Sequence, residues 1–380
     1  MTLTFPAAVL RRATTSRPYS RSRPLRIESV TAADPAEGEV LVRVEAAGLC
    51  RSDLSVVNGV RAWPMPIVPG HEASGVVEEV GPGVTGVRSG DHVVLIYQAR
   101  CGTCPSCSRG EVHLCGPGLA ANRRGELLGG GVRLSDGEGT IHHHMGVSAF
   151  ARYAVVSEHS LVVIDPDLPF EVGALLGCGV MCGAGSVLNT AAVEAGESVT
   201  VVGVGGVGSS AILGAVAAGA ERVVAVDLDP RRLEFALTLG ATDTVLAEEE
   251  AVSAAAKVRE LTSGGTDVAL ESAGTLAAFE TAFDSVRRGG RVATLGLVNP
   301  DTPFTLDVAA LVTSAKTIRG SYMGSCDPHR DIPRFVEWYR RGRLPLDRLI
   351  THRWGLADVN TALDHMVRRE GMRQMIHPWA

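Results

Sequence analysis

The chain has 380 residues, which is enough for two domains with hydrophobic cores of their own. Its hydrophobic content of 45% and charged content of 21% are typical of a soluble globular protein, and no apolar run approaches the length of a bilayer span. The formal net charge of -6 argues against nucleic-acid binding. Together with the short apolar runs, it leads us to expect neither a nucleic-acid nor a membrane partner. Eight cysteines, four of them clustered, indicate metal ligation in the reducing cytoplasm.

The first 180 or so residues contain short β-type runs separated by Gly and Pro, which predicts a compact, mostly antiparallel, barrel-like domain. Strands are expected at residues 7–10, 25–30, 40–44, 75–80, 92–96 and 151–156. The arginines from Arg11 to Arg26 superficially resemble a transit peptide, but we interpret them as a polar loop between the first two strands.

Four cysteines follow within one short stretch, with the spacing C-x2-C-x2-C-x7-C: Cys101, Cys104, Cys107 and Cys115. This spacing is typical of a closed structural zinc site with four thiolate ligands. Disulfides and an iron–sulfur cluster are the alternatives. The expected cytoplasmic location disfavours the disulfides, and the final spacing and Gly116 in place of a proline disfavour the cluster.

Three further ligand-type side chains, Cys50, His71 and Cys178, lie outside this cluster. Two thiolates and one imidazole form a ligand set for a zinc that keeps its fourth position open. The competing interpretation is that the buried thiols simply pack as small hydrophobic groups. We read His142, His143 and His144 as a loop, because three successive residues cannot all converge on one ion. Cys326 and His329 are expected at the surface.

From about residue 180 onward, strands alternate with helices, which predicts a parallel sheet with both faces covered. Strands are expected at residues 198–202, 222–226, 244–246, 267–271, 290–295 and 317–320, and helices at 206–218, 230–239, 248–261 and 276–286. We interpret the acidic run 248–250 as the start of its helix.

A glycine-rich turn directly follows the strand at 198–202 and opens the next helix: Gly203, Val204, Gly205, Gly206, Val207 and Gly208. This G-x-G-x-x-G context is typical of a dinucleotide site, where the helix N-terminus faces the pyrophosphate. Asp227 ends the next strand, nineteen residues after Gly208, and is expected to bind the adenosine ribose of NAD and to repel a 2′-phosphate. Arg231 and Arg232 lie nearby and leave open how strict that preference is.

Several motifs occur in a fixed order and span almost the whole chain: Cys50-Arg51-Ser52-Asp53, Gly70-His71-Glu72-x-x-Gly75-x5-Gly81, the cysteine cluster, Gly177-Cys178-Gly179 and the glycine loop. In this combination the chain resembles the zinc-dependent medium-chain alcohol dehydrogenases. The resemblance implies an α/β protein in which a Rossmann, doubly wound parallel sheet is joined to a GroES-like, mostly β catalytic domain. The implied domains are residues 1–180 with the zinc lobe at 101–115, an NAD-binding domain at 181–321, and a return to the catalytic domain at 322–380.

The resemblance also implies roles for individual residues. Cys50, His71 and Cys178 would hold a catalytic zinc that polarises a substrate oxygen while a hydride passes to or from the nicotinamide. Ser52 would take the alcohol proton, Asp53 would bond the second nitrogen of His71, and Glu72 would lie behind the zinc. The cofactor would also contact the glycine loop, Arg51, Asp227, Arg232, Leu295 and Arg373. The substrate pocket would be lined by Tyr97, His144, Met145 and Leu297.

Some positions depart from the family pattern. Ser55 stands where many relatives carry the histidine of a proton relay. Arg61 and Leu119 replace the charged residues that glutathione-dependent formaldehyde dehydrogenases use, which argues against thiol adducts of formaldehyde as substrates. The long segment 116–149 resembles that of the animal-type branch and implies a homodimer, with a tetramer as the alternative.

The function that these features favour is NAD-dependent oxidation of a primary alcohol and reduction of the matching aldehyde, with two zinc ions per chain. Aromatic and medium-chain alcohols are the candidate substrates. A zinc-free type of enone or quinone reductase on the same scaffold is the first alternative, but such relatives lack both ligand sets. A non-catalytic NAD-binding protein is the second, and loss of a ligand would indicate it, whereas all seven ligands are intact.

Overall fold

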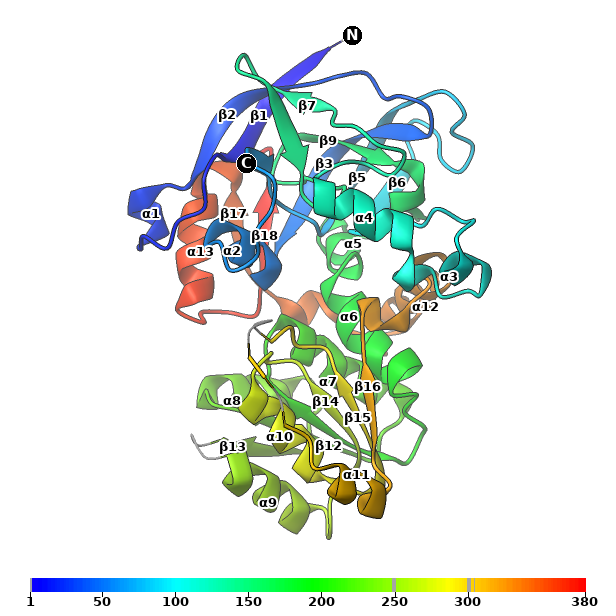
Figure 1. Ribbon diagram of the computed structural model, residues 1–380, viewed down its shortest axis with the longest axis vertical. Helices are drawn as coiled ribbons and strands as arrows, with labels where there is room; N and C mark the ends of the chain where they lie inside the picture. The colour runs from blue at the N-terminus through cyan, green and yellow to red at the C-terminus, as the bar shows by residue number, and fades with distance from the viewer. Residues whose placement is uncertain (1, 248–250, 299–301, 304) are drawn as a thin grey trace. The chain divides into compact units, whose positions relative to one another are not determined.

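A computed structural model describes residues 2–247, 251–298, 302–303 and 305–380, and the chain folds as two compact units. Unit 1 comprises residues 1–178, 327–333 and 350–380, and unit 2 comprises residues 179–326 and 334–349. The C-terminal segment expected to return to the first domain as a whole, residues 322–380, is therefore divided between the two units. Figure 1 traces both units along the chain.

Unit 1 contains two β structures. A closed barrel has the strand order β1-β2-β7-β8-β4, and a seven-stranded sheet has the order β10-β6-β5-β3-β18-β17, with β9 also paired to β3. The strands are β1 (Leu3–Leu10), β2 (Leu25–Ala32), β3 (Glu39–Leu49), β4 (Ile67–Val68), β5 (Ala73–Val80), β6 (His92–Leu95), β7 (Leu134–Ser135), β8 (Thr140–His143), β9 (Tyr153–Ser157), β10 (Leu161–Ile164), β17 (Ile350–Gly355) and β18 (Arg373–His377).

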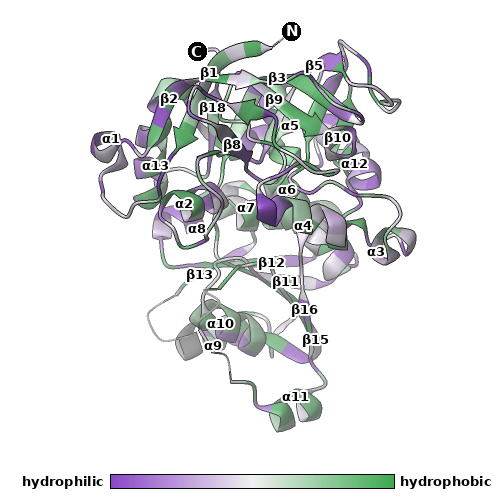
Figure 2. Ribbon diagram, turned by 45° about the horizontal axis from the view of Figure 1, so that its top comes forward, coloured by the Kyte–Doolittle hydropathy of each residue, from purple (hydrophilic) through white to green (hydrophobic). Residues whose placement is uncertain are grey.

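The helices of unit 1 are short: α1 (Tyr19–Ser22), α2 (Arg51–Val57), α3 (Pro105–Ser108), α4 (Gly116–Arg124), α5 (Phe170–Leu176) and α13 (Val359–Val367). Strand β3 organises the sheet, since it pairs antiparallel with β5, β9 and β18. Its alternate side chains, such as Val40, Val42 and Val44, are completely buried, and the strands of unit 1 carry hydrophobic stretches (green in Figure 2) between hydrophilic ones (purple). The expected barrel-like, mostly antiparallel domain is confirmed.

Unit 2 is built on a six-stranded, wholly parallel sheet with the order β13-β12-β11-β14-β15-β16. In sequence order this is 3-2-1-4-5-6, the strand order of the Rossmann fold. The strands are β11 (Ser198–Val202), β12 (Arg222–Asp227), β13 (Asp243–Leu246), β14 (Thr266–Glu271), β15 (Val286–Thr294) and β16 (Thr317–Gly320). The central strands are mostly apolar because both of their faces are buried.

The helices of unit 2 are α6 (Gly179–Gly185), α7 (Gly206–Ala218), α8 (Pro230–Thr238), α9 (Ala251–Leu261), α10 (Leu276–Ser285) and α11 (Val308–Ser314); α12 (Pro328–Arg340) crosses the division between the units. Short 3-10 turns occupy Val112–Leu114, Glu158–Ser160, Met323–Ser325, Leu346–Leu349 and Leu356–Asp358, and Ser186–Thr190 is π-helical. The expected strands and helices are present with ends that differ by a few residues, and the expected helix start at 248–250 lies outside the described residues.

Two expectations from the sequence were wrong. His142 and His143 belong to strand β8, because Ile67 and Val68 of β4 pair with them in parallel. Cys326 is completely buried in unit 2, where its thiol accepts a hydrogen bond of 3.3 Å from Nδ2 of Asn189, whereas His329 is exposed as expected. Among the described residues, no single helix is long and apolar enough to cross a membrane. The bent pair Phe170–Leu176 with Gly179–Thr190 passes that test only when both halves are counted together.

Candidate metal centres and dinucleotide site

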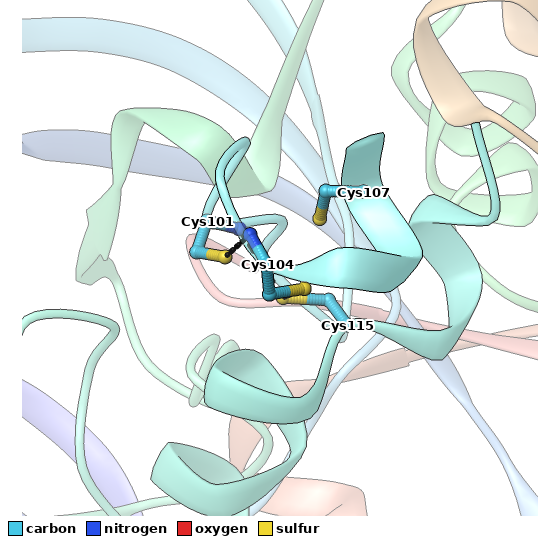
Figure 3. A group of neighbouring side chains, drawn as sticks. All are labelled: Cys101, Cys104, Cys107 and Cys115. Atoms are coloured by element: carbon cyan, nitrogen blue, oxygen red, sulfur yellow. Dashed lines mark hydrogen bonds between the residues drawn. The ribbon is translucent and has the colours of Figure 1, made fainter. Parts of the chain in front are cut away.

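The four clustered cysteines converge in unit 1, and their sulfur atoms all lie within 4.8 Å of one another (Figure 3). Sγ of Cys104 lies 4.0 Å from Sγ of Cys115. Zinc–sulfur bonds of about 2.3 Å in a tetrahedron place two sulfurs about 3.8 Å apart, so the cluster has the size of a zinc–thiolate site. With four protein ligands, such a site has no open position and is structural.

Backbone N–H groups around the cluster favour the thiolate forms. The N–H of Cys104 donates to Sγ of Cys101 at 3.3 Å (dashed in Figure 3), and the N–H of Cys101 donates to Sγ of Cys115 at 3.2 Å. Burial acts to raise the pKa of Cys101, but the backbone N–H groups of Thr103 and Cys104 outweigh it and lower that pKa to about 6. Zinc binds the deprotonated thiol, so these N–H groups favour the metal-bound form of Cys101, whereas burial raises the pKa of Cys115 to about 12.

The second ligand set also assembles within unit 1. Cys50 caps the N-terminus of α2, His71 precedes β5, and Cys178 follows α5; all three are buried. Sγ of Cys178 lies 3.5 Å from Nε2 of His71. Tetrahedral zinc, with bonds of about 2.3 Å to sulfur and about 2.0–2.1 Å to nitrogen, needs these atoms about 3.5–3.6 Å apart. The three donors fit a zinc that retains one position for another oxygen.

Asp53 accepts hydrogen bonds from two of the three ligand residues. Its Oδ1 accepts hydrogen bonds of 3.0 Å from Nδ1 of His71 and from the N–H of Gly70, and its Oδ2 accepts one of 2.9 Å from the N–H of Cys50. Although burial opposes ionisation, the facing His71 keeps the pKa of Asp53 well below its usual range. The carboxylate therefore fixes the proton on Nδ1 and leaves Nε2 available as a ligand.

A second acidic side chain next to His71 is also buried. Glu72 ion-pairs with Arg373 from β18, and both side chains are almost inaccessible to solvent. Burial lowers the pKa of Arg373, while the adjacent Cys50 acts to raise it. The structure thus pairs Glu72, which follows the ligand His71 in sequence, with Arg373; the position of Glu72 behind a zinc and the contact of Arg373 with the cofactor stay predictions.

Helix α2 presents the expected proton acceptor directly after the first ligand. Ser52 lies in its first turn and is partly buried, while Arg51 is exposed. The hydroxyl of Ser55, one turn later, donates to the backbone oxygen of Arg51 at 3.0 Å. Ser55 is therefore engaged by its own helix, as is usual for a helical serine.

Aromatic rings surround His71. Tyr97 packs edge-on against it with ring centroids 5.8 Å apart, and His144 does so at 5.3 Å. His144 is completely buried, and its ring centroid lies 5.0 Å from that of Trp63. Trp63 was not expected at the site, because no sequence motif marks it. Met145 follows His144 with a positive φ of 53°. The fourth expected pocket residue, Leu297, belongs to unit 2 and is 62% exposed.

The glycine loop of unit 2 has the backbone that a dinucleotide site requires. Gly203 has φ of +91°, which side chains disfavour, and a Cβ on Gly208 would collide with the carbonyl oxygen of Gly203. A Cβ on Gly205 would meet nothing closer than an Arg232 nitrogen, at 3.9 Å, so the surface there is open to a ligand. Helix α7 begins at Gly206, as expected.

Asp227 lies at the carboxyl end of β12, beside this loop. Its carboxylate accepts the N–H of Val204 at 2.6 Å and the N–H of Asp229 at 3.0 Å. Nη1 of Arg232 lies 4.0 Å from Asp227, whereas Arg231 pairs with Asp229 at 2.8 Å. At the carboxyl end of β14, the N–H of Leu295 donates to the backbone oxygen of Glu271 at 2.8 Å.

The fold and the two ligand sets define a zinc-binding dehydrogenase with a Rossmann unit, and comparison with known proteins agrees. Residues 36–166 match the alcohol dehydrogenase GroES-like domain family, and residues 206–341 match the zinc-binding dehydrogenase family. The chain belongs to the zinc-dependent medium-chain alcohol dehydrogenases, which are oxidoreductases acting on CH–OH groups.

Three relatives illustrate the match. An NDMA-dependent alcohol dehydrogenase of Amycolatopsis methanolica is 40% identical over 371 residues, covering 94% of this chain and 96% of the relative. An S-(hydroxymethyl)glutathione dehydrogenase of a Synechocystis species is 36% identical over 361 residues, covering 94% and 98%. The crystal structure of benzyl alcohol dehydrogenase from Acinetobacter calcoaceticus has a TM-score of 0.90 at 32% identity, covering 99% of both chains.

Proposed function

We propose that the protein catalyses reversible hydride transfer between a primary alcohol and NAD, with one catalytic and one structural zinc per chain. The observation that carries this proposal is the 3.5 Å separation of Cys178 Sγ and His71 Nε2. Cys50 belongs to the same group of ligand atoms, and Asp53 bonds the other ring nitrogen of His71. When bound there, zinc supplies Lewis-acid catalysis at a substrate oxygen. Ser52 accepts the alcohol proton, and Asp53 keeps His71 in the tautomer that ligates.

NAD is the proposed cofactor because of the site around Asp227. A carboxylate at this position accepts hydrogen bonds from ribose hydroxyls and repels a 2′-phosphate. The open backbone at Gly205 and the N-terminus of α7 would receive the pyrophosphate. Arg51, Arg232, Leu295 and Arg373 are proposed as further cofactor contacts.

Aromatic and medium-chain primary alcohols are the proposed substrates. The rings of Tyr97 and His144 beside His71 give the site an aromatic wall, and one structural relative is named a benzyl alcohol dehydrogenase. One relative is named an S-(hydroxymethyl)glutathione dehydrogenase, but Arg61 and Leu119 in this chain argue against a glutathione adduct. Enone reduction without zinc and cofactor binding without catalysis are both disfavoured by the two complete ligand sets.

The deciding experiment is an assay of primary, secondary and aromatic alcohols and their carbonyl products, with nicotinamide absorbance as the readout. NAD and NADP are the acceptors for the alcohols, and NADH and NADPH are the hydride donors for the carbonyl compounds. NDMA is a third acceptor, followed by its own consumption, because one relative is named for it. We expect turnover of primary alcohols with NAD that stops when zinc is removed. Turnover that survives complete zinc removal, or reduction of enones alone, would overturn the proposal.

A cytoplasmic homodimer is the proposed state of the protein. All eight cysteines are free of disulfides, which suits thiolate metal sites in a reducing compartment. Strand β16 ends the parallel sheet of unit 2 and is largely exposed, so it offers an edge for a second copy. Light scattering coupled to size exclusion would distinguish a dimer from a tetramer.

A further inference from the structure

The carboxylate behind the zinc ligands faces two histidines. Nδ1 of His71 lies 3.0 Å from Oδ1 of Asp53, and Nδ1 of His144 lies 3.3 Å from the same oxygen. The N–H of Gly70 donates to that oxygen as well, at 3.0 Å. Asp53, His71 and His144 are all buried, so their charges and dipoles interact without competition from water. Oδ1 of Asp53 thus has three nitrogen atoms within 3.3 Å.

His144 is held at this place by contacts that do not use its ring nitrogens. Its backbone N–H donates to Oγ of Ser148 at 2.8 Å, and its ring packs edge-on against Trp63 and His71. Both ring nitrogens are buried, and neither has an aligned hydrogen-bond partner among the described residues. The neighbouring His143 differs, since its Nε2 accepts the N–H of Arg133 at 3.1 Å. A buried imidazole without an aligned bond is costly, which points to a role beyond packing.

We propose that His144 is a positioning residue that tunes the zinc ligand His71 through their shared partner Asp53; this inference rests on the proposed catalytic zinc. A proton on Nδ1 of His144, 3.3 Å from Oδ1 of Asp53, attracts charge on that oxygen electrostatically even without an aligned hydrogen bond, so the carboxylate pulls less strongly on the Nδ1 proton of His71. The Nε2 of His71 is then a weaker donor, and a zinc held there keeps more of its Lewis acidity. Residues bonded to metal ligands change metal affinity by about 10–100-fold.

Removing the ring N–H of His144 should strengthen zinc binding, whereas most substitutions near a metal site weaken it. His144→Phe keeps an aromatic ring of similar size but removes the N–H, so His71 remains as the single imidazole neighbour of Asp53 beside the backbone N–H groups of Gly70 and Cys50. We therefore expect this variant to release its catalytic zinc about 10-fold more slowly than the wild type. A merely structural defect would loosen the site and speed release. His144→Asn places an amide N–H near the position of Nδ1 and should restore the wild-type rate.

The test measures zinc release from the purified, fully loaded enzyme into a chromogenic chelator. The zinc of the four-cysteine cluster provides an internal reference, because its release phase should be the same in all variants. Trp63→Phe serves as the packing control, since Trp63 packs against the ring of His144 and has no titratable group of its own. If His144→Phe does not fold, His144→Leu takes its place.

Slower release in His144→Phe with wild-type release in His144→Asn and Trp63→Phe supports the inference. Unchanged or faster release in His144→Phe overturns it, as does the same change in Trp63→Phe or no recovery in His144→Asn. A wild-type protein that binds only the zinc of the cysteine cluster would instead overturn the proposed function. The two failures are therefore distinguishable by the zinc content alone.

Discussion

The carboxylate of Glu72 and the guanidinium of Arg373 form a buried ion pair although the two residues stand 301 positions apart in the sequence. The pair joins the segment that carries His71 to the C-terminal strand β18. A buried charge that loses its partner is strongly destabilising, whereas replacing both charges by apolar groups can be nearly neutral.

Glu72→Gln should therefore lower the free energy of unfolding by about 3–5 kcal/mol. The double variant Glu72→Met, Arg373→Met should recover most of this loss, because no uncompensated charge remains. Urea denaturation followed by circular dichroism provides the measurement, and Glu79→Gln, at an exposed position of β5, is the control. Equal stability of Glu72→Gln and the wild type would show that the pair contributes little.

Metal analysis of the purified protein should give two zinc ions per chain, one for each ligand set. Cys104→Ser should reduce the content to about one and lower the thermal midpoint, because the cluster is structural. Cys50→Ser should abolish turnover in a protein that still folds. The control is Cys326→Ser, which removes a buried thiol that belongs to neither ligand set. Normal activity in Cys50→Ser would contradict the catalytic assignment.

Asp227→Ala should weaken the use of NAD and improve the use of NADP, because it removes both the ribose acceptor and the repulsion of a 2′-phosphate. Nη1 of Arg232 lies 4.0 Å from Asp227, so in this variant Arg232 can pair with the 2′-phosphate of NADP. The ratio of kcat/KM for the two cofactors is the measurement, with Asp243→Ala at the amino end of β13 as the control. A wild-type preference for NADP would mean that the arginines outweigh the carboxylate.

Ser52→Ala should remove nearly all alcohol oxidation while cofactor binding survives, because the alcohol must lose its proton before hydride leaves. Ser55→His should increase oxidation most at low pH, near the ordinary histidine pKa of about 6.5. Cofactor fluorescence separates binding from turnover in both variants. An unchanged pH–rate profile in Ser55→His would indicate that protons leave by a path that avoids α2.

Asp267 of β14 should make unit 2 sensitive to acid. Burial acts to raise the pKa of this carboxyl, but Ser198 and Arg287, at 2.7 Å each, outweigh it and lower the pKa to about 2. A carboxyl with a lowered pKa stabilises the folded state above its unfolded pKa of 3.8, and this stabilisation is lost as the pH falls through about 2. Asp267→Asn should cost about 1–2 kcal/mol at pH 7 and almost nothing near pH 2. Chemical denaturation across this range is the measurement, and a constant difference would contradict the pKa.

Sequence alone determined the features that are written locally. The four-cysteine cluster spans fifteen residues, and the glycine loop with its strand and helix spans about twenty, so their spacing alone predicts the chemistry. The alternation of strands and helices after residue 180 likewise predicted the parallel sheet, because a buried strand needs apolar residues on both faces.

Only the tertiary structure decided the relationships between distant segments. The ion pair of Glu72 with Arg373 and the sharing of Asp53 by His71 and His144 join loops and strand ends that no local pattern connects. Residues 142 and 143 form a strand instead of a loop because their partner strand, at residues 67–68, lies about 75 residues earlier. Cys326 is buried by Met181 and Gly185, which precede it by more than 140 residues. Long-range packing decides such positions because burial depends on neighbours that the chain brings together only when it folds.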